Sequence, residues 1–159
     1  MHIATKSSKI DITLEKDTQS ISQKISNYLS KGDIVFLYGE IGVGKTTFVK
    51  HLINSLQFNS NNKIIEVPSP TFNIVYEYKI DELIIQHYDL YRVKSHMELK
   101  NIGIFENQKD SLTLVEWPEI IKEKPKNIIE LNFNYEENLS KRSLIISSNY
   151  KKEIFNEFK

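Results

Sequence analysis

The chain has 159 residues, of which 40% are hydrophobic, and this is enough for a single domain with a sizeable core. Its 21 Lys and Arg residues balance its 21 Asp and Glu residues, which disfavours a bulk nucleic-acid binder or a membrane-surface protein, and the lack of cysteine excludes disulfides and thiolate metal sites. Because the sequence shows neither a signal peptide nor an apolar run of about 18 residues, we expect a cytoplasmic protein without membrane contact.

The segment before residue 38 predicts a strand, a helix and a second strand. Residues 10–14 alternate apolar and polar side chains, as half-buried strands do. Asp17 or Thr18 is a suitable N-cap for the helix that follows. Residues 33–37 are rich in β-branched and aromatic side chains, which indicates a strand. The helix has an apolar face that consists of Ile21, Ile25, Tyr28 and Leu29.

The segment from Gly39 to Thr46 fits the pattern Gly-x-x-x-x-Gly-Lys-[Ser/Thr] of a phosphate-binding loop. It lies between the strand 33–37 and a predicted helix whose apolar residues begin at Phe48. In such a loop, backbone N–H groups surround the phosphates, Lys45 lies along the β- and γ-phosphates, and the Thr46 hydroxyl binds Mg²⁺. The pattern and its flanks predict nucleoside triphosphate binding rather than an accidental glycine-rich turn.

Residues 63–67 predict another strand, which runs into Pro68-Ser69-Pro70-Thr71-Phe72. Two prolines stiffen this crossing, so its simplest interpretation is a rigid turn between strands. Beside a phosphate-binding loop there is an alternative, in which the hydroxyl of Ser69 or Thr71 senses the γ-phosphate as switch loops do.

Residues 73–79 and 83–89 predict two antiparallel strands joined by a short turn. A period of two places His87 and Asp89 on one face of the second strand. If that face turns toward the phosphate-binding loop, Asp89 ends the strand at the place where Mg²⁺ needs a carboxylate. Nothing adjacent in sequence activates His87, so a structural histidine is the favoured interpretation over a general base.

A short helix over residues 95–101 precedes the apolar strand 112–115, which ends in Glu116. Phosphate-loop enzymes supply their second acidic group to metal or water from the end of such a strand. Glu116 matches that pattern better than Asp89 does, and the alternative from the residues alone is an exposed acid at the end of a strand. Trp117 follows, and its indole either packs in the core or stacks on a purine.

Residues 127–134 and 143–148 predict two final strands, and a short helix follows them. Neither a repeat nor a linker divides the sequence, so we expect residues 1–159 to form one domain. The order of strands and helices predicts the α/β class, as a single P-loop NTPase-like domain with a mixed β-sheet flanked by helices.

Five segments occur in the same order and at similar spacing in one known family. They are Gly39-Glu40-Ile41-Gly42-Val43-Gly44-Lys45-Thr46-Thr47-Phe48, Ser69-Pro70-Thr71-Phe72, His87-Tyr88-Asp89-Leu90-Tyr91-Arg92, Glu98-Leu99 before Gly103-Ile104, and Glu116-Trp117-Pro118. In this set the chain resembles the TsaE (YjeE) family, the small ATPase of the bacterial pathway that makes threonylcarbamoyladenosine in tRNA. The loop is common to many proteins, whereas the combination of the other segments is specific.

The resemblance implies ATP and ADP as nucleotides and Mg²⁺ as the metal ion, bound by Thr46 and Glu116. Asp89 would support the metal ion or the attacking water, Thr71 would belong to a switch-like loop, and Trp117 would lie by the adenine. The catalytic residues implied are Lys45, Thr71, Asp89 and Glu116. The metal ligands implied are Thr46, Asp89 and Glu116. The nucleotide-binding residues implied are Thr18, Glu40, Ile41, Gly42, Val43, Gly44, Lys45, Thr46, Thr47, Trp117 and Arg142.

The resemblance also implies partner subunits related to TsaD and TsaB, which raise a slow ATPase rate, and contact with tRNA only through that complex. Two other functions stay open at this point. A small-molecule kinase of the same loop class usually carries an arginine-rich lid, whereas this chain has only Arg92 and Arg142. A nucleotide-gated binding module with negligible turnover gains some support from the lack of an evident arginine finger. Arg92 itself is either a phosphate contact or a partner for Asp81 or Glu82.

Overall fold

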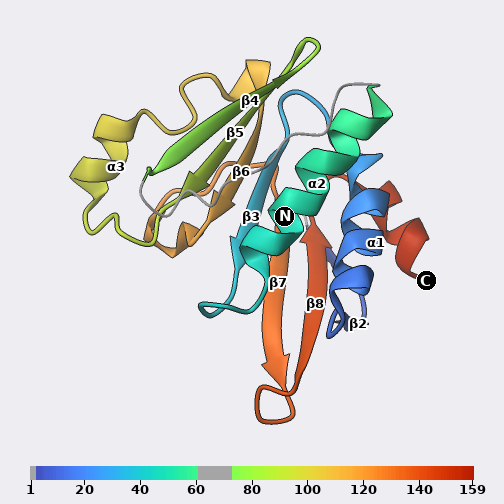
Figure 1. Cartoon of the computed structure of the whole chain (residues 1–159). Coiled ribbons are helices and arrows are strands. Elements are labelled where there is room, and N and C mark those ends of the chain that lie inside the picture. The colour runs from blue at the N-terminus through green and yellow to red at the C-terminus, as the bar shows by residue number, and fades with distance from the viewer. Residues whose placement is uncertain (1–2, 61–72) are drawn as a thin grey trace.

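The computed structural model describes residues 3–60 and 73–159, in which helices flank a mixed sheet (Figure 1). The α-helices of this part are α1 (Glu15–Ser26), α2 (Lys45–Asn59) and α3 (His96–Ile102). Its strands are β1 (Thr5–Lys6), β2 (Ile10–Asp11), β3 (Ile34–Tyr38), β4 (Val75–Ile80), β5 (Leu83–Asp89), β6 (Ser111–Glu116), β7 (Ile129–Glu136) and β8 (Lys141–Ser148). Short 3₁₀ turns, η1 (Gln108–Asp110), η2 (Pro118–Ile120) and η3 (Lys152–Phe158), complete it.

The sheet has the strand order β1-β8-β7-β3-β6-β5-β4, and β2 also pairs with β8. Strand β3 is parallel to both β6 and β7, and β5 is parallel to β6. Antiparallel pairs flank this parallel centre, formed by β4 with β5 and by β7 with β8. The predicted α/β fold with a mixed sheet is therefore confirmed.

Three parallel strands end together at one edge of the sheet. Leu37 of β3 is paired with Glu116 of β6, and Glu116 is paired in turn with Asp89 of β5. The helix α2 begins just after β3, so its first turn lies at the same edge. Ligands of α/β proteins bind at the carboxyl ends of such strands, and this edge therefore holds the candidate site.

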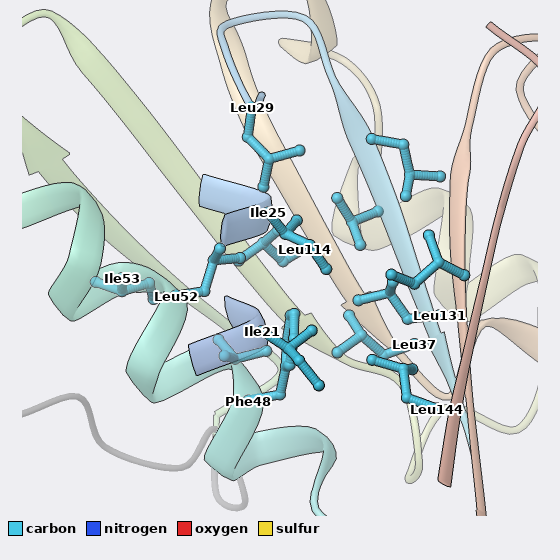
Figure 2. Close-up of a cluster of buried hydrophobic side chains, with 14 of the residues drawn as sticks. Ile21, Ile25, Leu29, Leu37, Phe48, Leu52, Ile53, Leu114, Leu131 and Leu144 are labelled. Carbon is cyan, nitrogen blue, oxygen red and sulfur yellow. The ribbon is translucent and has the colours of Figure 1, made fainter. Parts of the chain in front are cut away.

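Helices α1 and α2 lie side by side on one face of the sheet (Figure 1). Their apolar side chains pack on the strands, and Figure 2 shows Phe48 and Leu52 of α2 among the buried residues of this layer. Burial of each such side chain contributes about 1.5–3 kcal/mol to folding. A second buried cluster, which includes Phe36, Val115 and Leu99 of α3, covers the opposite face. Packing on both faces explains why β3 reads as a continuous apolar run and why every residue of β6 is buried.

The hairpin over 73–89 and the strand that ends at Glu116 are confirmed, as are the last two strands and the short C-terminal helical segment. The helix over 95–101 is confirmed within one residue, and the Ser95 hydroxyl caps it by accepting the backbone N–H of Glu98. The predicted strand 63–67 and the turn 68–72 lie outside the described residues.

Two predictions near the N-terminus are wrong. The strand expected over 10–14 is only the two residues of β2, and α1 begins at Glu15 with Leu14, not Asp17 or Thr18, at its N-cap. The backbone N–H groups of Asp17 and Thr18 instead donate to the Leu14 carbonyl, so both residues belong to the first turn. An acidic residue there still interacts favourably with the helix dipole.

No helix within residues 3–60 and 73–159 has both the length and the apolar composition that a bilayer crossing requires.

A buried carboxylate at the start of β3 ties the C-terminal segment to the sheet. Asp33 is 5% exposed, and it accepts hydrogen bonds from the Tyr150 hydroxyl at 2.7 Å and from the Lys151 ammonium. The backbone N–H of Ser30 donates to the same carboxylate at 2.8 Å. A buried carboxylate is tolerated only when such partners surround it.

We expect Tyr150→Phe to lower the free energy of unfolding by about 1.5–3 kcal/mol, because it removes a hydrogen bond to a buried charged group. Urea unfolding of the variant and the unchanged chain measures this difference. Tyr28→Phe is the matched control, since the Tyr28 hydroxyl donates to exposed Glu157 on the same C-terminal segment and its loss should hardly matter. Equal effects of the two changes would contradict a special role of Asp33.

Candidate functional site

The predicted phosphate-binding loop joins β3 to α2 in a conformation that requires glycine. A Cβ atom on Gly39 would lie 2.8 Å from both the backbone oxygen of Phe133 and Cγ1 of Val43. Gly44, at the N-cap of α2, has a φ of 115°, which residues with side chains rarely adopt. The Tyr135 hydroxyl of β7 donates to the backbone carbonyl of Ile41 at 3.1 Å. The loop is therefore held against β7 with its backbone close to the sheet.

We expect Gly39→Ala to lower stability by about 1–3 kcal/mol and to weaken nucleotide binding, because the added methyl group displaces the loop from β7. Thermal unfolding and nucleotide titration measure the two effects. Gly103→Ala is the matched control: Gly103 also has a positive φ, of 72°, but its Cβ would meet only the movable Glu106 side chain. Unchanged nucleotide affinity in Gly39→Ala would contradict the interpretation that nucleotide binding needs the loop close to β7.

Lys45 begins α2 and folds back over its own loop. Its ammonium donates to the Gly39 carbonyl and, at 3.5 Å, to that of Glu40, and it lies 3.6 Å from the centroid of the Trp117 ring. Burial lowers the pKa of Lys45, while the nearby carboxylates, first among them that of Glu116, oppose this effect. The side chain is a buried cation at the start of a helix, where a phosphate is favoured.

Glu116 connects α2 with two strands. Its carboxylate is 1% exposed; Oε1 accepts the Thr46 hydroxyl at 2.9 Å, and Oε2 is 2.7 Å from Nε2 of His87. Both oxygens thus have partners that come from different elements. The prediction that the strand 112–115 carries a carboxylate to the loop agrees with this geometry.

Asp89 ends β5 directly beside Glu116. Its Oδ1 accepts the backbone N–H of Tyr91 at 3.0 Å, which fixes the carboxylate at the end of the strand. Burial raises the pKa of Asp89; the hydrogen bond from Tyr91 opposes that change, and the negative charge of Glu116 adds to it. Two partly desolvated carboxylates side by side form a place that attracts a cation.

These groups line one cavity of about 500 Å³. Both arginines of the chain, Arg92 and Arg142, take part in its wall, and Arg142 also lies 5.8 Å from the ring centroid of Tyr135. The lining residues are Ile41, Gly42, Gly44, Lys45, Thr46, Thr47, Asn73, Ile74, Asp89, Tyr91, Arg92, Glu116, Trp117 and Arg142. The volume is in the range of small-ligand sites.

Trp117 occupies a left-handed backbone conformation, with φ 57° and ψ 53°, directly after β6. Such a conformation is a genuine outlier for a bulky residue and is found most often at functional sites. The ring is partly buried, lies 4.9 Å from that of Tyr91, and contacts the cavity as well as the second apolar cluster. Both interpretations of the indole, packing and contact with a ligand, are thus compatible with its position.

Not every candidate residue lies on the cavity. Glu40 instead lines a neighbouring hollow together with Tyr91 and Glu119, and Val43 is buried beneath the loop. Thr18 is buried within α1 and is absent from the cavity wall. Thr71 lies outside the described residues. The roles assigned to Thr18 and Thr71 therefore stay predictions.

Sequence reasoning missed two contributors to this site. The fully buried, hydrogen-bonded ring of His87 agrees with a structural histidine, but the sequence does not indicate that its partner is Glu116. The second contributor is Tyr135, whose hydroxyl supports the loop at Ile41. The shared face of His87 and Asp89 was the one signal in the sequence, whereas nothing in the sequence pointed to Tyr135.

The donors at this edge fit Mg²⁺ carried by a nucleotide. Thr46, Glu116 and Asp89 offer only oxygen atoms, which a hard cation prefers. Within residues 3–60 and 73–159, no group of three or more His, Asp or Glu side chains could hold a metal ion. Mg²⁺ in nucleotide enzymes needs no such group, since one or two carboxylates suffice beside phosphates and water.

Comparison with known proteins gives one consistent result. A family model described as "Threonylcarbamoyl adenosine biosynthesis protein TsaE" matches residues 12–144. The chain is 38% identical over 138 residues to a "tRNA threonylcarbamoyladenosine biosynthesis protein TsaE" of Rickettsia conorii, covering 86% of this chain and 76% of that protein. A protein of the same name from Aquifex aeolicus is 36% identical over 115 residues, covering 72% of this chain and 78% of the relative.

Among solved structures, the chain is similar to YdiB of Bacillus subtilis. The TM-score is 0.77, the superposition covers 99% of this chain and 97% of that one, and the sequences are 23% identical. This likeness concerns the fold, and it extends over the whole sheet and its helices.

Proposed function

Because the chain belongs to the TsaE family, which is involved in tRNA threonylcarbamoyladenosine biosynthesis, we propose that it binds ATP with Mg²⁺ and hydrolyses it in that pathway. The observation that carries the proposal is the 2.9 Å hydrogen bond between Thr46 and Glu116. It joins the hydroxyl of the phosphate-binding loop to a strand-end carboxylate inside the same cavity as Lys45. This is the pair of groups that phosphate-loop enzymes use at their metal ion.

The chain's own residues supply the binding and the electrostatics of the reaction. The amides of the loop and the start of α2 hold the phosphates, and Lys45 moves from the loop carbonyls to the β- and γ-phosphates. Thr46 and Glu116 would hold Mg²⁺, which when bound would neutralise charge that develops on the phosphates. Asp89 would support the metal ion or orient the attacking water. Hydrolysis breaks the bond to the γ-phosphoryl group, and water supplies the oxygen of the phosphate released.

The nucleoside lies toward Trp117 in this proposal. The indole lines the cavity beside Tyr91, and a purine ring stacks well on such an aromatic surface. Arg142 lines the same cavity and is placed to contact the sugar or the phosphates. Thr18 completes the set that the family resemblance assigns to the base and sugar.

Partner subunits related to TsaD and TsaB belong to the same proposal, and tRNA is contacted only through them. We expect the isolated chain to turn over slowly, and the partners to raise its rate. Arg92 lines the cavity and is the internal candidate to neutralise the γ-phosphate when the partners dock; the alternative is a residue of a partner. The segment with Thr71 would report the nucleotide state to the docked surface.

The function is tested in the organism from which the chain comes. Depletion of the chain should lower the threonylcarbamoyladenosine content of bulk tRNA, as measured by mass spectrometry of its nucleosides. Expression of the unchanged chain should restore that content, while expression of Lys45→Ala should not. Unchanged tRNA after depletion, or full rescue by Lys45→Ala, would show that this chain's nucleotide site is not needed for the modification.

A further inference from the structure

His87 is the feature of the site that the proposed mechanism does not use. Its side chain is fully buried in β5, and Nε2 lies 2.7 Å from Oε2 of Glu116. The other oxygen of that carboxylate accepts the Thr46 hydroxyl. We propose that His87 is a positioning residue, which holds Glu116 in the one orientation that presents its carboxylate to Thr46 and the metal ion. This inference rests on the proposed function and deepens it.

The arrangement of the strands determines which groups meet here. His87 is paired with Leu114 in the parallel register of β5 and β6, and Asp89 is paired with Glu116. Side chains alternate between the two faces of a sheet, so His87 and Glu116 point to the face that α2 covers. Three elements, β5, β6 and the first turn of α2, thus contribute one member each to a chain of hydrogen bonds that runs from the buried His87 to Thr46 at the cavity.

The direction of the hydrogen bond follows from the chemistry of its partners. A carboxylate only accepts hydrogen bonds, so Nε2 of His87 carries the proton and donates it to Glu116. Among the described residues, Nδ1 of the same ring has no hydrogen-bond partner. Within the described residues, Glu116 is therefore the hydrogen-bond partner of this buried ring, and an unsatisfied buried nitrogen is a cost that functional sites tolerate.

A hydrogen bond of this kind matters because a carboxylate can rotate. With Oε2 held by His87, Oε1 stays at the Thr46 hydroxyl, and the plane of the carboxylate is fixed. Without that donor, Oε2 would have no hydrogen-bond partner, although Glu116 is only 1% exposed. The carboxylate would then rotate so that Oε2 reaches Thr46 or the cavity. Groups that orient a metal ligand in this manner typically account for about 10–100-fold in metal affinity.

Three variants separate this role from simple packing. His87→Leu removes the donor and keeps an apolar side chain, whereas His87→Gln keeps an N–H donor. Thr113→Val is the control, because Thr113 is also fully buried on β6 and its hydroxyl has no partner among the described residues, but it points to the opposite face of the sheet.

The measurement is the affinity for a non-hydrolysable ATP analogue, determined by calorimetry with Mg²⁺ and again with EDTA. The gain from Mg²⁺ is the ratio of the affinity for the analogue with Mg²⁺ to that with EDTA. We expect this ratio to be smaller in His87→Leu than in the unchanged chain by about tenfold or more. The affinity of the variant for the analogue in EDTA should be unchanged. His87→Gln should recover most of that gain, and Thr113→Val should match the unchanged chain.

A full Mg²⁺-dependent gain in His87→Leu would overturn the inference and leave the proposed function intact. The same would follow from an equal loss in Mg²⁺ and in EDTA, which indicates packing, or from failure of His87→Gln to exceed His87→Leu. If the unchanged chain gains no affinity from Mg²⁺, the proposed function fails as well, so the two failures are distinguishable.

Discussion

Lys45→Ala should reduce the rate of ATP hydrolysis by roughly a thousandfold, because it removes the loop cation that neutralises charge on the transferred phosphoryl group. The side chain is 5% exposed and lies against loop carbonyls and the Trp117 ring, so its ammonium has no substitute within the loop. Alanine is a good helix former, and the start of α2 should remain helical. Release of phosphate under saturating ATP measures the effect.

Lys50→Ala provides the matched control for that experiment. Lys50 is an exposed lysine of the same helix, five residues from Lys45, so the variant has the same change in net charge. It should hydrolyse ATP at the unchanged rate. Hydrolysis by Lys45→Ala at the rate of the Lys50→Ala control would contradict the assignment of residues 39–46 as the phosphate-binding loop.

Glu116→Gln should lower hydrolysis on the order of a hundredfold while nucleotide binding changes much less, since a metal or water ligand acts mainly in the transition state. The substitution keeps the size of the side chain but replaces one acceptor with a donor. Both oxygens of Glu116 already accept hydrogen bonds, from Thr46 and His87, so the amide nitrogen of the variant takes the place of one acceptor, and the bond there must reverse its direction or be lost. Asp89→Ala should act in the same direction.

The control for Glu116 is Glu119→Gln, which removes an exposed carboxylate three residues further along the chain. The negative charge of Glu119 also acts on Lys45, so the control tests whether electrostatic proximity alone explains the result. It should leave turnover nearly unchanged. A loss of nucleotide binding in Glu116→Gln as large as its loss of turnover would instead indicate a structural role for Glu116.

The parts of this fold that were predictable from sequence are those with local signals. The strand and the helix that flank residues 39–44 have clear sequence patterns, and the structure confirms both as β3 and α2. The carboxylate at the end of β6 was predictable for the same reason. Its contact with Thr46, 70 residues away, required the added assumption that the apolar strand lies next to β3, and the register of Leu37 with Glu116 shows that it does.

The predictions that failed depend on contacts between distant segments. The backbone N–H of Ile12 donates to the Arg142 carbonyl, and that of Arg142 donates to the Thr13 hydroxyl, so β8 holds residues 12–13 extended. The chain can turn into α1 only after them, and this overrides the local capping preference of Asp17 and Thr18. The structural interpretation of His87 agrees with its buried, hydrogen-bonded ring, but the identity of its partner could not be predicted, because Glu116 lies 29 residues away on a neighbouring strand.

The most direct test of the central claim is the release of ADP from ATP by the purified chain, measured with Mg²⁺ or EDTA and with or without the TsaD-like and TsaB-like proteins of the same organism. We predict slow release that requires Mg²⁺ and rises when both partners are added. No release of ADP under any of these conditions would contradict the claim that this chain is an ATPase. Rapid release of ADP that does not change when the partners are added would contradict the proposal that this chain acts in a complex with them.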